Sequence, residues 1–224
     1  MKKQFEFLIM QFAVLLAGLL PYCAFAQNKP PFYEEIIAFK TQDSLSFPAP
    51  GQILFIGSSS FSRWRDVAEY FPRKQILNRG FGGSSLTDLI RYQDDIIYPY
   101  QPDKIVIYCG ENDFAGSDTI TVPIVVGRFQ TLFAAIRYRL PQVPIVFVSI
   151  KPSPGRTHLM PKFAEANAAI RLFLKARLRT HYVNVYSPML NRDGRPKPDI
   201  FGKDSLHMNA KGYSIWQKKL RKKL

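Results

Sequence analysis

The residues best suited to covalent chemistry lie in two segments far apart in the sequence. Ser59 lies in a glycine-containing turn, residues 57–60, that follows a short apolar run. Asp204 and His207 lie three residues apart near the C-terminus. At that spacing in a turn, a carboxylate can accept a hydrogen bond from one imidazole nitrogen, while the other nitrogen takes a proton from a serine hydroxyl. The pattern predicts a serine nucleophile, although a serine at the start of a helix is often only a cap.

His207 is the best candidate for the base among the three histidines of the chain. His158 follows a loop rich in proline and glycine. His181 lies at the start of a predicted strand and has no acidic neighbour. Only His207 follows a carboxylate, that of Asp204, at a spacing that lets the two side chains meet in a turn.

Two further segments carry groups that could stabilise a negative charge developing on oxygen. Three glycines fall within residues 80–83, where backbone can approach a ligand without side-chain obstruction. Asn112, within residues 109–113, has a side-chain amide that is a neutral hydrogen-bond donor. Each segment also has an ordinary explanation. The glycines suit a tight turn, and Asn and Asp often build turns by bonding to their own backbone.

Apolar runs alternate with helical patterns along the chain, and this alternation predicts the elements that position these residues. Runs rich in β-branched and aromatic residues predict buried strands at 53–56, 75–78, 104–108, 145–150 and 182–186. Apolar residues at intervals of three and four predict helices at 125–140 and 163–178, with weaker patterns at 61–70, 86–97 and 210–220. The order predicts a three-layer α/β/α fold with a five-stranded parallel sheet. Ligands bind beyond the carboxyl ends of such strands, where the candidate residues lie.

Taken together, these segments resemble the SGNH hydrolases, also known as GDSL-like lipases and acylhydrolases. The resemblance covers roughly residues 52–216. In this family a Ser, a Gly, an Asn and a His mark four sequence blocks, and here they fall on Ser59, Gly83, Asn112 and His207. Asp204 matches the acid of the family's Asp-x-x-His motif.

Two of the blocks are close matches and one departs from the family pattern. The stretches GEND at 110–113 and DSLHMNAKGY at 204–213 follow the family closely. The first block usually reads Gly-Asp-Ser, whereas Ser58 stands here in place of the aspartate. The register still puts the nucleophile at Ser59, so the departure bears on the rate more than on the reaction class.

The resemblance implies a flavodoxin-like SGNH fold and an esterase mechanism that uses neither a cofactor nor a metal. Ser59 would be the nucleophile, His207 the base, and Asp204 the group that orients the imidazole. The oxyanion hole would consist of the backbone N–H groups of Ser59 and Gly83 and the amide of Asn112.

The resemblance leaves the substrate open, because family members act on lipids, thioesters and acylated carbohydrates. Since the sequence has no long insertion that would form a lid, we expect removal of a small acyl group from a carbohydrate or glycoconjugate. A lipid-ester, lysophospholipase-like hydrolase is the alternative. An alternative of another class is a non-catalytic carbohydrate- or envelope-binding module on the same scaffold.

The N-terminus predicts export to the periplasm or the medium. Basic residues precede an apolar stretch at 7–20, and the expected signal peptide, residues 1–26, ends with cleavage after Ala26. The apolar stretch is shorter than the roughly 18 to 20 residues that span a bilayer. Cys23 suggests lipid attachment instead, but the bulky Tyr22 before it disfavours that reading. Residues 27–51, with several prolines and little periodicity, are predicted to be an arm or linker, and residues 52–224 the hydrolase domain.

The chain is strongly basic, with a formal net charge of +14. Predicted export and the absence of a recognition motif argue against nucleic acid as a partner. The basic residues near the C-terminus suit a solvated helix face, and a weak attraction to an anionic envelope surface is the other interpretation. The partner that the resemblance implies is a small-molecule or glycan ester.

Overall fold

One parallel sheet organises the part of the chain that the computed structural model describes, residues 29–224. Its strands are β1 (Ile53–Gly57), β2 (Ile76–Gly80), β3 (Lys104–Tyr108), β4 (Ile145–Val148) and β5 (Thr180–Val183). They lie in the order β2-β1-β3-β4-β5, which is the order of flavodoxin-like folds. The predicted three-layer fold with a five-stranded parallel sheet is confirmed. In this topology a crevice opens at the carboxyl ends of β1 and β3, where the strand order reverses.

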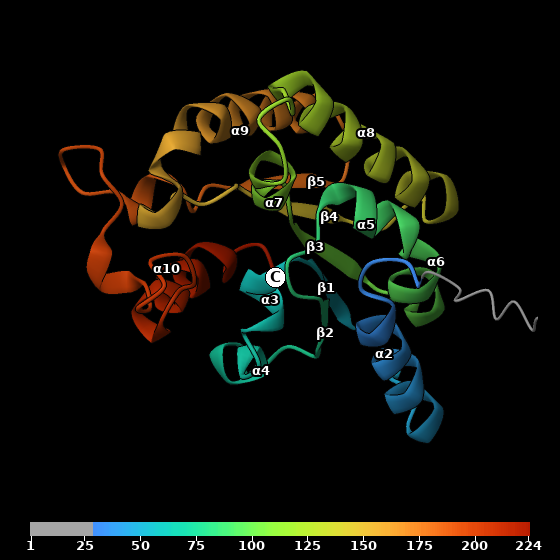
Figure 1. Cartoon of the computed structure of the whole chain (residues 1–224). Helices are drawn as coiled ribbons and strands as arrows, with labels where there is room; N and C mark the ends of the chain where they lie inside the picture. The colour runs from blue at the N-terminus through green and yellow to red at the C-terminus, as the bar shows by residue number, and fades with distance from the viewer. Residues whose placement is uncertain (1–28) are drawn as a thin grey trace, which may run out of the picture. The chain divides into compact units, whose positions relative to one another are not determined.

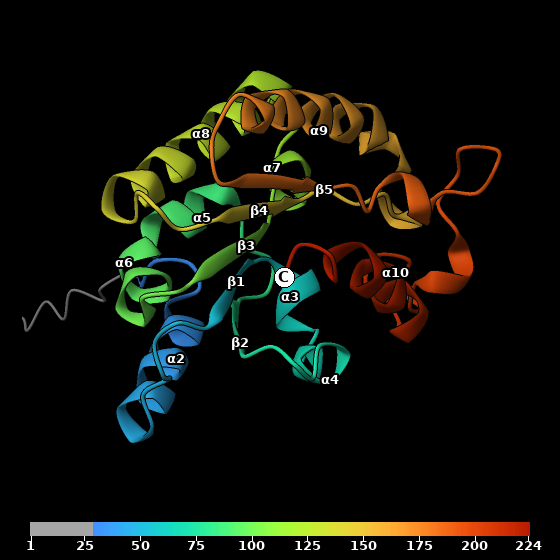
Figure 2. The same ribbon diagram turned by 180° about the vertical axis from the view of Figure 1, so that it is seen from behind.

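The three central strands, β1, β3 and β4, are apolar on both faces because helices cover both sides of the sheet. In β1, Leu54 and Ile56 pack into one cluster of buried side chains, and Ile53 and Phe55 pack into the other. The first cluster includes residues of α2 (Tyr33–Leu45), α5 (Leu86–Arg91), α6 (Gln93–Ile96), α7 (Glu111–Ala115), α8 (Val122–Arg139) and α9 (Met160–Lys175). The second includes residues of α3 (Ser59–Ser62), α4 (Val67–Tyr70) and α10 (Ala210–Leu220). Helices α8 and α9 thus lie on one side of the sheet and α3 and α10 on the other (Figure 1; Figure 2).

Local sequence explains where the helices near the site begin. Helices α8 and α9 each carry a proline in the first turn, where its missing N–H costs no helical hydrogen bond. Helix α10 is capped by Asn209, whose side-chain oxygen accepts from the backbone N–H groups of Lys211 and Gly212 at 2.9 and 3.3 Å. This cap fixes the start of α10 directly after His207 and Met208.

The prediction of an arm or linker at 27–51 is wrong for residues 33–45, which form α2. Ile36 is buried in the core, and the Tyr92 hydroxyl donates to the carbonyl oxygen of Pro31 at 2.7 Å. The prolines at 30, 31, 48 and 50 that suggested an extended segment all lie outside the helix. Residues 31–224 form one compact unit, so the domain begins before Gln52. The predicted signal peptide lies outside the described residues.

The strand predicted at 145–150 is shorter than expected because side-chain hydrogen bonds replace backbone pairing at its carboxyl end. Strand β4 ends at Val148, and the Ser149 hydroxyl then accepts from the backbone N–H groups of Val185 and Tyr186. The Asn167 side chain accepts from the backbone N–H of Ile150 and donates to the carbonyl oxygen of the same residue, at 2.8 and 2.9 Å. The segment after β4 therefore leaves the sheet early and runs across its carboxyl edge. The helices predicted at 61–70 and 86–97 are each divided in two, the first into α3 and α4 and the second into α5 and α6.

Between residues 29 and 224, no helix combines the length and the apolar character needed to cross a membrane.

Candidate active site

Ser59 lies at the sharp turn between β1 and α3. Gly57 adopts a φ of 147°, and a Cβ at that position would lie 1.9 Å from the carbonyl oxygen of Tyr108, so only glycine fits. Ser58 is extended, and its carbonyl oxygen accepts from the backbone N–H of Phe61 at 2.8 Å. Ser59 is therefore the first residue of α3, immediately beyond the carboxyl end of β1.

The side chains of Ser59, His207 and Asp204 form a continuous chain of contacts. His207 Nε2 lies 3.0 Å from Ser59 Oγ, and His207 Nδ1 lies 2.6 Å from Asp204 Oδ2. The other carboxylate oxygen accepts from the backbone N–H groups of Leu206 and His207 at 3.0 and 2.9 Å. These hydrogen bonds, above all the one from the imidazole, hold the pKa of Asp204 well below its usual range. With Nδ1 donating to the ionised carboxylate, Nε2 can accept the serine proton.

Among the three consecutive serines, Ser59 is the one whose hydroxyl contacts the imidazole. Ser58 and Ser60 are both buried. The backbone N–H of Ser58 donates to the end of β3 at 3.1 Å, and the carbonyl of Ser60 accepts from the Tyr213 hydroxyl at 3.0 Å. These contacts anchor the turn on both sides, so the serine that replaces the family's aspartate leaves Ser59 facing the imidazole.

Gly83 and Asn112 line the same small cavity as Ser59, which has a volume of about 320 Å³. Gly83 has a left-handed φ of 79°, which glycine adopts without strain. Among the hydrogen bonds within residues 29–224, none uses the backbone N–H of Ser59 or of Gly83. The Asn112 amide donates one N–H to the carbonyl oxygen of Ser84 at 3.1 Å and keeps a second. The cavity therefore presents three groups that can donate to an oxygen beside Ser59.

Arg156 also lines this cavity, although no motif in the sequence marks it. Its Nη1 donates to Asn112 Oδ1 at 3.0 Å and lies 3.2 Å from Oε1 of the buried Glu111. Glu111 also pairs with the buried Lys151 at 2.9 Å and accepts from the Tyr108 hydroxyl at 2.7 Å. Burial alone would raise the pKa of Glu111, but the charges of Lys151 and Arg156 outweigh it and lower that pKa. This ionised cluster holds the Asn112 amide in one orientation.

A wider groove of about 820 Å³ adjoins the small cavity. The two share the lining residues Ser62, Arg63, Gly82 and His207. Helix α2 contributes to the groove through Phe39 and its neighbours. The segment predicted as a linker is thus part of the wall beside the candidate nucleophile, and no pattern in the sequence indicates this role.

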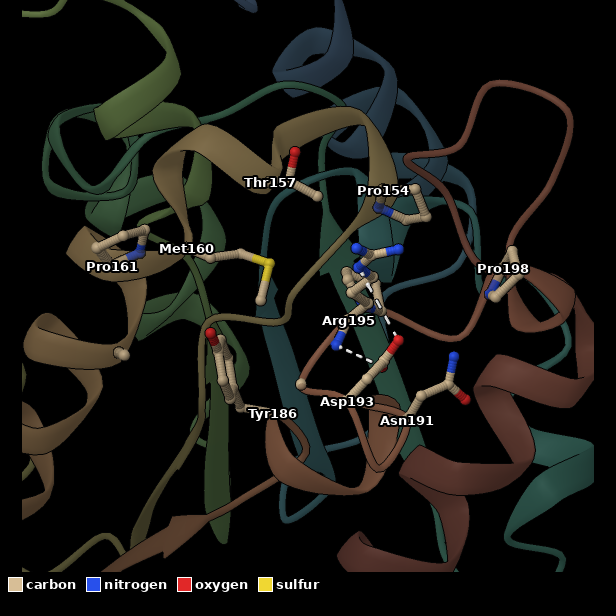
Figure 3. Close-up of a pocket in the computed structure, with 12 residues that line it drawn as sticks. Pro154, Thr157, Met160, Pro161, Tyr186, Asn191, Asp193, Arg195 and Pro198 are labelled. Atoms are coloured by element: carbon tan, nitrogen blue, oxygen red, sulfur yellow. Dashed lines mark hydrogen bonds and ion pairs between the residues drawn. The ribbon is translucent and has the colours of Figure 1, made fainter.

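A third cavity, of about 850 Å³, lies on the other side of the turn that carries Arg156. Met160 and Tyr186 line it together with the pair formed by Asp193 and Arg195, whose side chains approach to 3.9 Å (Figure 3). It shares no lining residue with the cavity around Ser59. Because the nucleophile and its partners line the smaller cavity, that cavity is the candidate active site.

Within residues 29–224, no group of three or more His, Cys, Asp or Glu side chains is arranged to hold a metal ion.

Comparison with protein families matches residues 43–215 to the GDSL-like Lipase/Acylhydrolase family. No sequence among the curated proteins matches the chain.

Solved structures with the same fold include three that differ in their described activity. A protein from Streptococcus pneumoniae provisionally named platelet activating factor is 23% identical, with a TM-score of 0.75 and coverage of 96% of this chain and 98% of that one. A GDSL-like lipase from Bacteroides thetaiotaomicron is 21% identical, with a TM-score of 0.71 and coverage of 84% and 96%. A catalytic mutant of an acetylxylan esterase from Geobacillus stearothermophilus is 12% identical, with a TM-score of 0.63 and coverage of 78% and 94%. At these identities the likeness establishes the fold.

Proposed function

Because the chain belongs to the GDSL-like lipase/acylhydrolase family, we propose that it is an exported serine esterase in which Ser59, His207 and Asp204 form the catalytic triad. The observation that carries this proposal is the unbroken series of contacts from Asp204 Oδ2 through the imidazole to Ser59 Oγ, at 2.6 and 3.0 Å. Such a series is the arrangement that activates a serine for attack on a carbonyl carbon.

In the first step, His207 Nε2 takes the Ser59 proton as Oγ attacks the ester carbonyl. The imidazolium that forms keeps its Nδ1–H on Asp204, whose lowered pKa keeps it ionised beside the positive ring. The backbone hydrogen bonds to the second carboxylate oxygen fix the direction of this contact. Asp204 thus sets the tautomer and stabilises the charged ring without itself taking the proton.

The carbonyl oxygen becomes negative as the tetrahedral intermediate forms. The backbone N–H groups of Ser59 and Gly83 and the free N–H of Asn112 are the donors that would meet it. Donors of this kind contribute about 3 to 4 kcal/mol each to the stability of the transition state. Arg156 supports the third donor by holding the amide oxygen of Asn112 at 3.0 Å.

The intermediate collapses when His207 Nε2–H gives its proton to the departing alcohol oxygen. Water then attacks the acyl-enzyme, with His207 as base, and the acid leaves as Oγ recovers the proton. Every proton passes through the one nitrogen that lies 3.0 Å from Ser59 Oγ.

For the substrate, we propose a small acyl group on a carbohydrate or glycoconjugate. The cavity at Ser59, about 320 Å³, is at the low end of the range of about 300 to 1,000 Å³ for ligand pockets. The similarity in fold to an acetylxylan esterase agrees with this reading. A lysophospholipase-like activity is the second candidate, and the similarity in fold to a GDSL-like lipase agrees with it. A non-catalytic module would have no use for a serine hydroxyl in contact with an imidazole.

A panel of esters tests the proposal. Purified protein is assayed on acetyl, butyryl and long-chain esters and on acetylated sugars, beside Ser59→Ala and the matched control Ser58→Ala. We expect preference for acetyl esters, a loss of at least about 10⁴-fold in kcat for Ser59→Ala, and retained activity for Ser58→Ala. Full activity of Ser59→Ala would overturn the mechanism, and preference for long chains would overturn the substrate assignment.

Export is proposed from the predicted signal peptide at residues 1–26. The mass and N-terminal sequence of the protein recovered from cells test it. A mature chain that begins at Gln27 supports export, and an intact N-terminus in the cytoplasmic fraction would contradict it.

A further inference from the structure

Arg63 lies one helical turn beyond the nucleophile and lines both cavities that adjoin it. Its backbone N–H donates to the carbonyl oxygen of Ser59 at 3.0 Å, so the two residues keep a fixed relation through α3. The side chain is exposed, and no carboxylate of residues 29–224 forms an ion pair with it. By contrast, Arg156 pairs with Glu111. Arg63 is therefore a guanidinium beside the nucleophile with its charge available to a ligand.

The residues that line each cavity indicate which part of an ester lies in each. The oxyanion donors Gly83 and Asn112 line the small cavity and do not line the wider groove. His207 lines both, and it must protonate the departing oxygen. When Gly83 and Asn112 hold the carbonyl oxygen of the ester, the acyl group lies in the small cavity. The alcohol part then extends past Arg63 toward the groove. This step rests on the proposed function.

The groove beyond Arg63 has a positive balance of charge. Arg65 lines it and, like Arg63, has no ion-pair partner within the described residues. Glu35 on α2 is the one carboxylate among the residues that line the groove in the described chain. Apolar surface from Phe39 and Phe81 completes the wall. A ligand there meets two guanidinium groups, one carboxylate and two aromatic rings.

We propose that this groove binds the alcohol part of the ester and selects an alcohol that carries an anionic group, which Arg63 pairs. A carboxylate, a phosphate or a sulfate fits this description, because the planar guanidinium binds such oxyanions through two parallel N–H donors. Because Arg63 lies one helical turn from Ser59, one molecule can place its ester at the nucleophile and its anionic group at Arg63.

Pairs of acetyl esters that differ only in charge test the proposal. An O-acetylated methyl glycoside is compared with its uronic acid counterpart, and acetylglycerol with acetylglycerol phosphate, so that a sugar source and a lipid-like source of the anion are distinguished. The kcat/KM of each is measured for the unmodified protein, Arg63→Gln and Arg63→Lys. Arg73→Gln is the matched control, because it removes the same charge from an exposed arginine that lines neither cavity.

We expect the unmodified protein to prefer the anionic member of at least one pair, and Arg63→Gln to lower that anionic-to-neutral ratio by about 10-fold. Arg63→Lys keeps the charge without the planar fork and should give an intermediate ratio. Arg73→Gln should leave the ratio and the activity unchanged. The pair with the larger loss identifies the source of the anion.

An unchanged ratio in Arg63→Gln, or an equal loss in Arg73→Gln, would overturn the inference. Labelling with a fluorophosphonate separates this failure from failure of the proposed function. A protein that is labelled and hydrolyses the neutral esters, but shows no anionic preference, would refute the role of Arg63 and leave the esterase in place. A protein that neither reacts with the probe nor hydrolyses any ester would refute both.

Discussion

Replacing Asp43 by Asn should loosen the attachment of α2 to the edge of the sheet. Arg79, in β2, is buried and donates to Asp43 through Nη2 and to the Tyr100 hydroxyl at 2.8 Å through Nε. The Tyr100 hydroxyl in turn donates to the second Asp43 oxygen at 2.5 Å. The guanidinium also lies over the rings of Phe39 and Tyr100, at 5.0 and 4.9 Å. Asp43→Asn keeps the shape of the side chain but leaves the buried guanidinium without its counter-charge.

The expected loss in the free energy of unfolding follows from the burial of the Arg79–Asp43 pair. The Arg79 and Asp43 side chains are 5% and 10% exposed, so water screens the lost interaction little. Removing one member of a buried pair typically costs about 3 to 5 kcal/mol. The amide can still accept one hydrogen bond, so we expect the low end, about 3 kcal/mol. For a domain of this size, 1 kcal/mol corresponds to about 2 to 4 °C in Tm, which gives a fall of about 6 to 12 °C.

Thermal unfolding followed by circular dichroism measures this effect, with Asp94→Asn as the control. Asp94 pairs with Arg139 at the surface, where the two side chains are 71% and 50% exposed, and that change should cost no more than about 1 kcal/mol. A fall in Tm for Asp43→Asn no larger than that for Asp94→Asn would refute the claim that this pair anchors α2.

Three further substitutions test the site and its turn. Arg156→Met removes the hydrogen bond to Asn112 Oδ1, so kcat on an acetyl ester should fall by about 10-fold with little change in KM. A change in KM alone would contradict the role of Arg156 in orienting the Asn112 amide. Asp204→Asn should lower kcat by about 10⁴-fold, because the amide favours the wrong tautomer of His207. Since the pKa of Asp204 is depressed, the stability that its ionised carboxylate contributes is present at neutral pH and is lost only as the pH falls through the acidic range. In denaturant unfolding, a stability difference between the unmodified protein and Asp204→Asn that is already lost near neutral pH would therefore count against this assignment. Gly57→Ala should destabilise the fold by about 2 to 4 kcal/mol in denaturant unfolding, because the alanine Cβ would meet a backbone oxygen of β3 at 1.9 Å. An unchanged unfolding midpoint would contradict the requirement for glycine at this turn.

The strands and the main helices could be predicted because their signals are local. The central strands β1, β3 and β4 are short runs of apolar side chains that are buried on both faces of the sheet. Leu54 and Phe55 of β1, for example, lie in opposite clusters. Asn112 follows β3 in the sequence. Because ligands bind at the carboxyl edge of a parallel sheet, this position predicted that Asn112 belongs to the site. The contact between Ser59 and His207 joins residues 148 positions apart, and the sequence pattern placed both at that edge.

Helix α2 could not be predicted because its attachment depends on contacts distant in sequence. Its hydrophobic pattern is weak, and the nearby prolines favour an extended segment. What holds the helix is the burial of Ile36 and the pairing of Asp43 with Arg79, which is 36 residues away. The sequence shows neither partner as special, because a lone aspartate and a lone arginine are ordinary surface residues.

The roles of Arg156 and Arg63 also lie beyond the sequence pattern. Arg156 reaches Asn112 only because the segment after β4 leaves the sheet early, and that departure depends on side-chain bonds from Ser149 and Asn167. Arg63 differs from other exposed arginines only in the cavities that it lines. Neither position has a motif that marks it.

The most direct measurement of the central claim is the site of covalent labelling by a fluorophosphonate. The three serines at 58, 59 and 60 lie side by side in the sequence, and only Ser59 Oγ contacts His207 Nε2. Mass spectrometry of the digested adduct should therefore place the phosphonyl group on Ser59, and labelling should be lost in Ser59→Ala and retained in Ser58→Ala. An adduct on another residue, or labelling that persists in Ser59→Ala, would contradict the account.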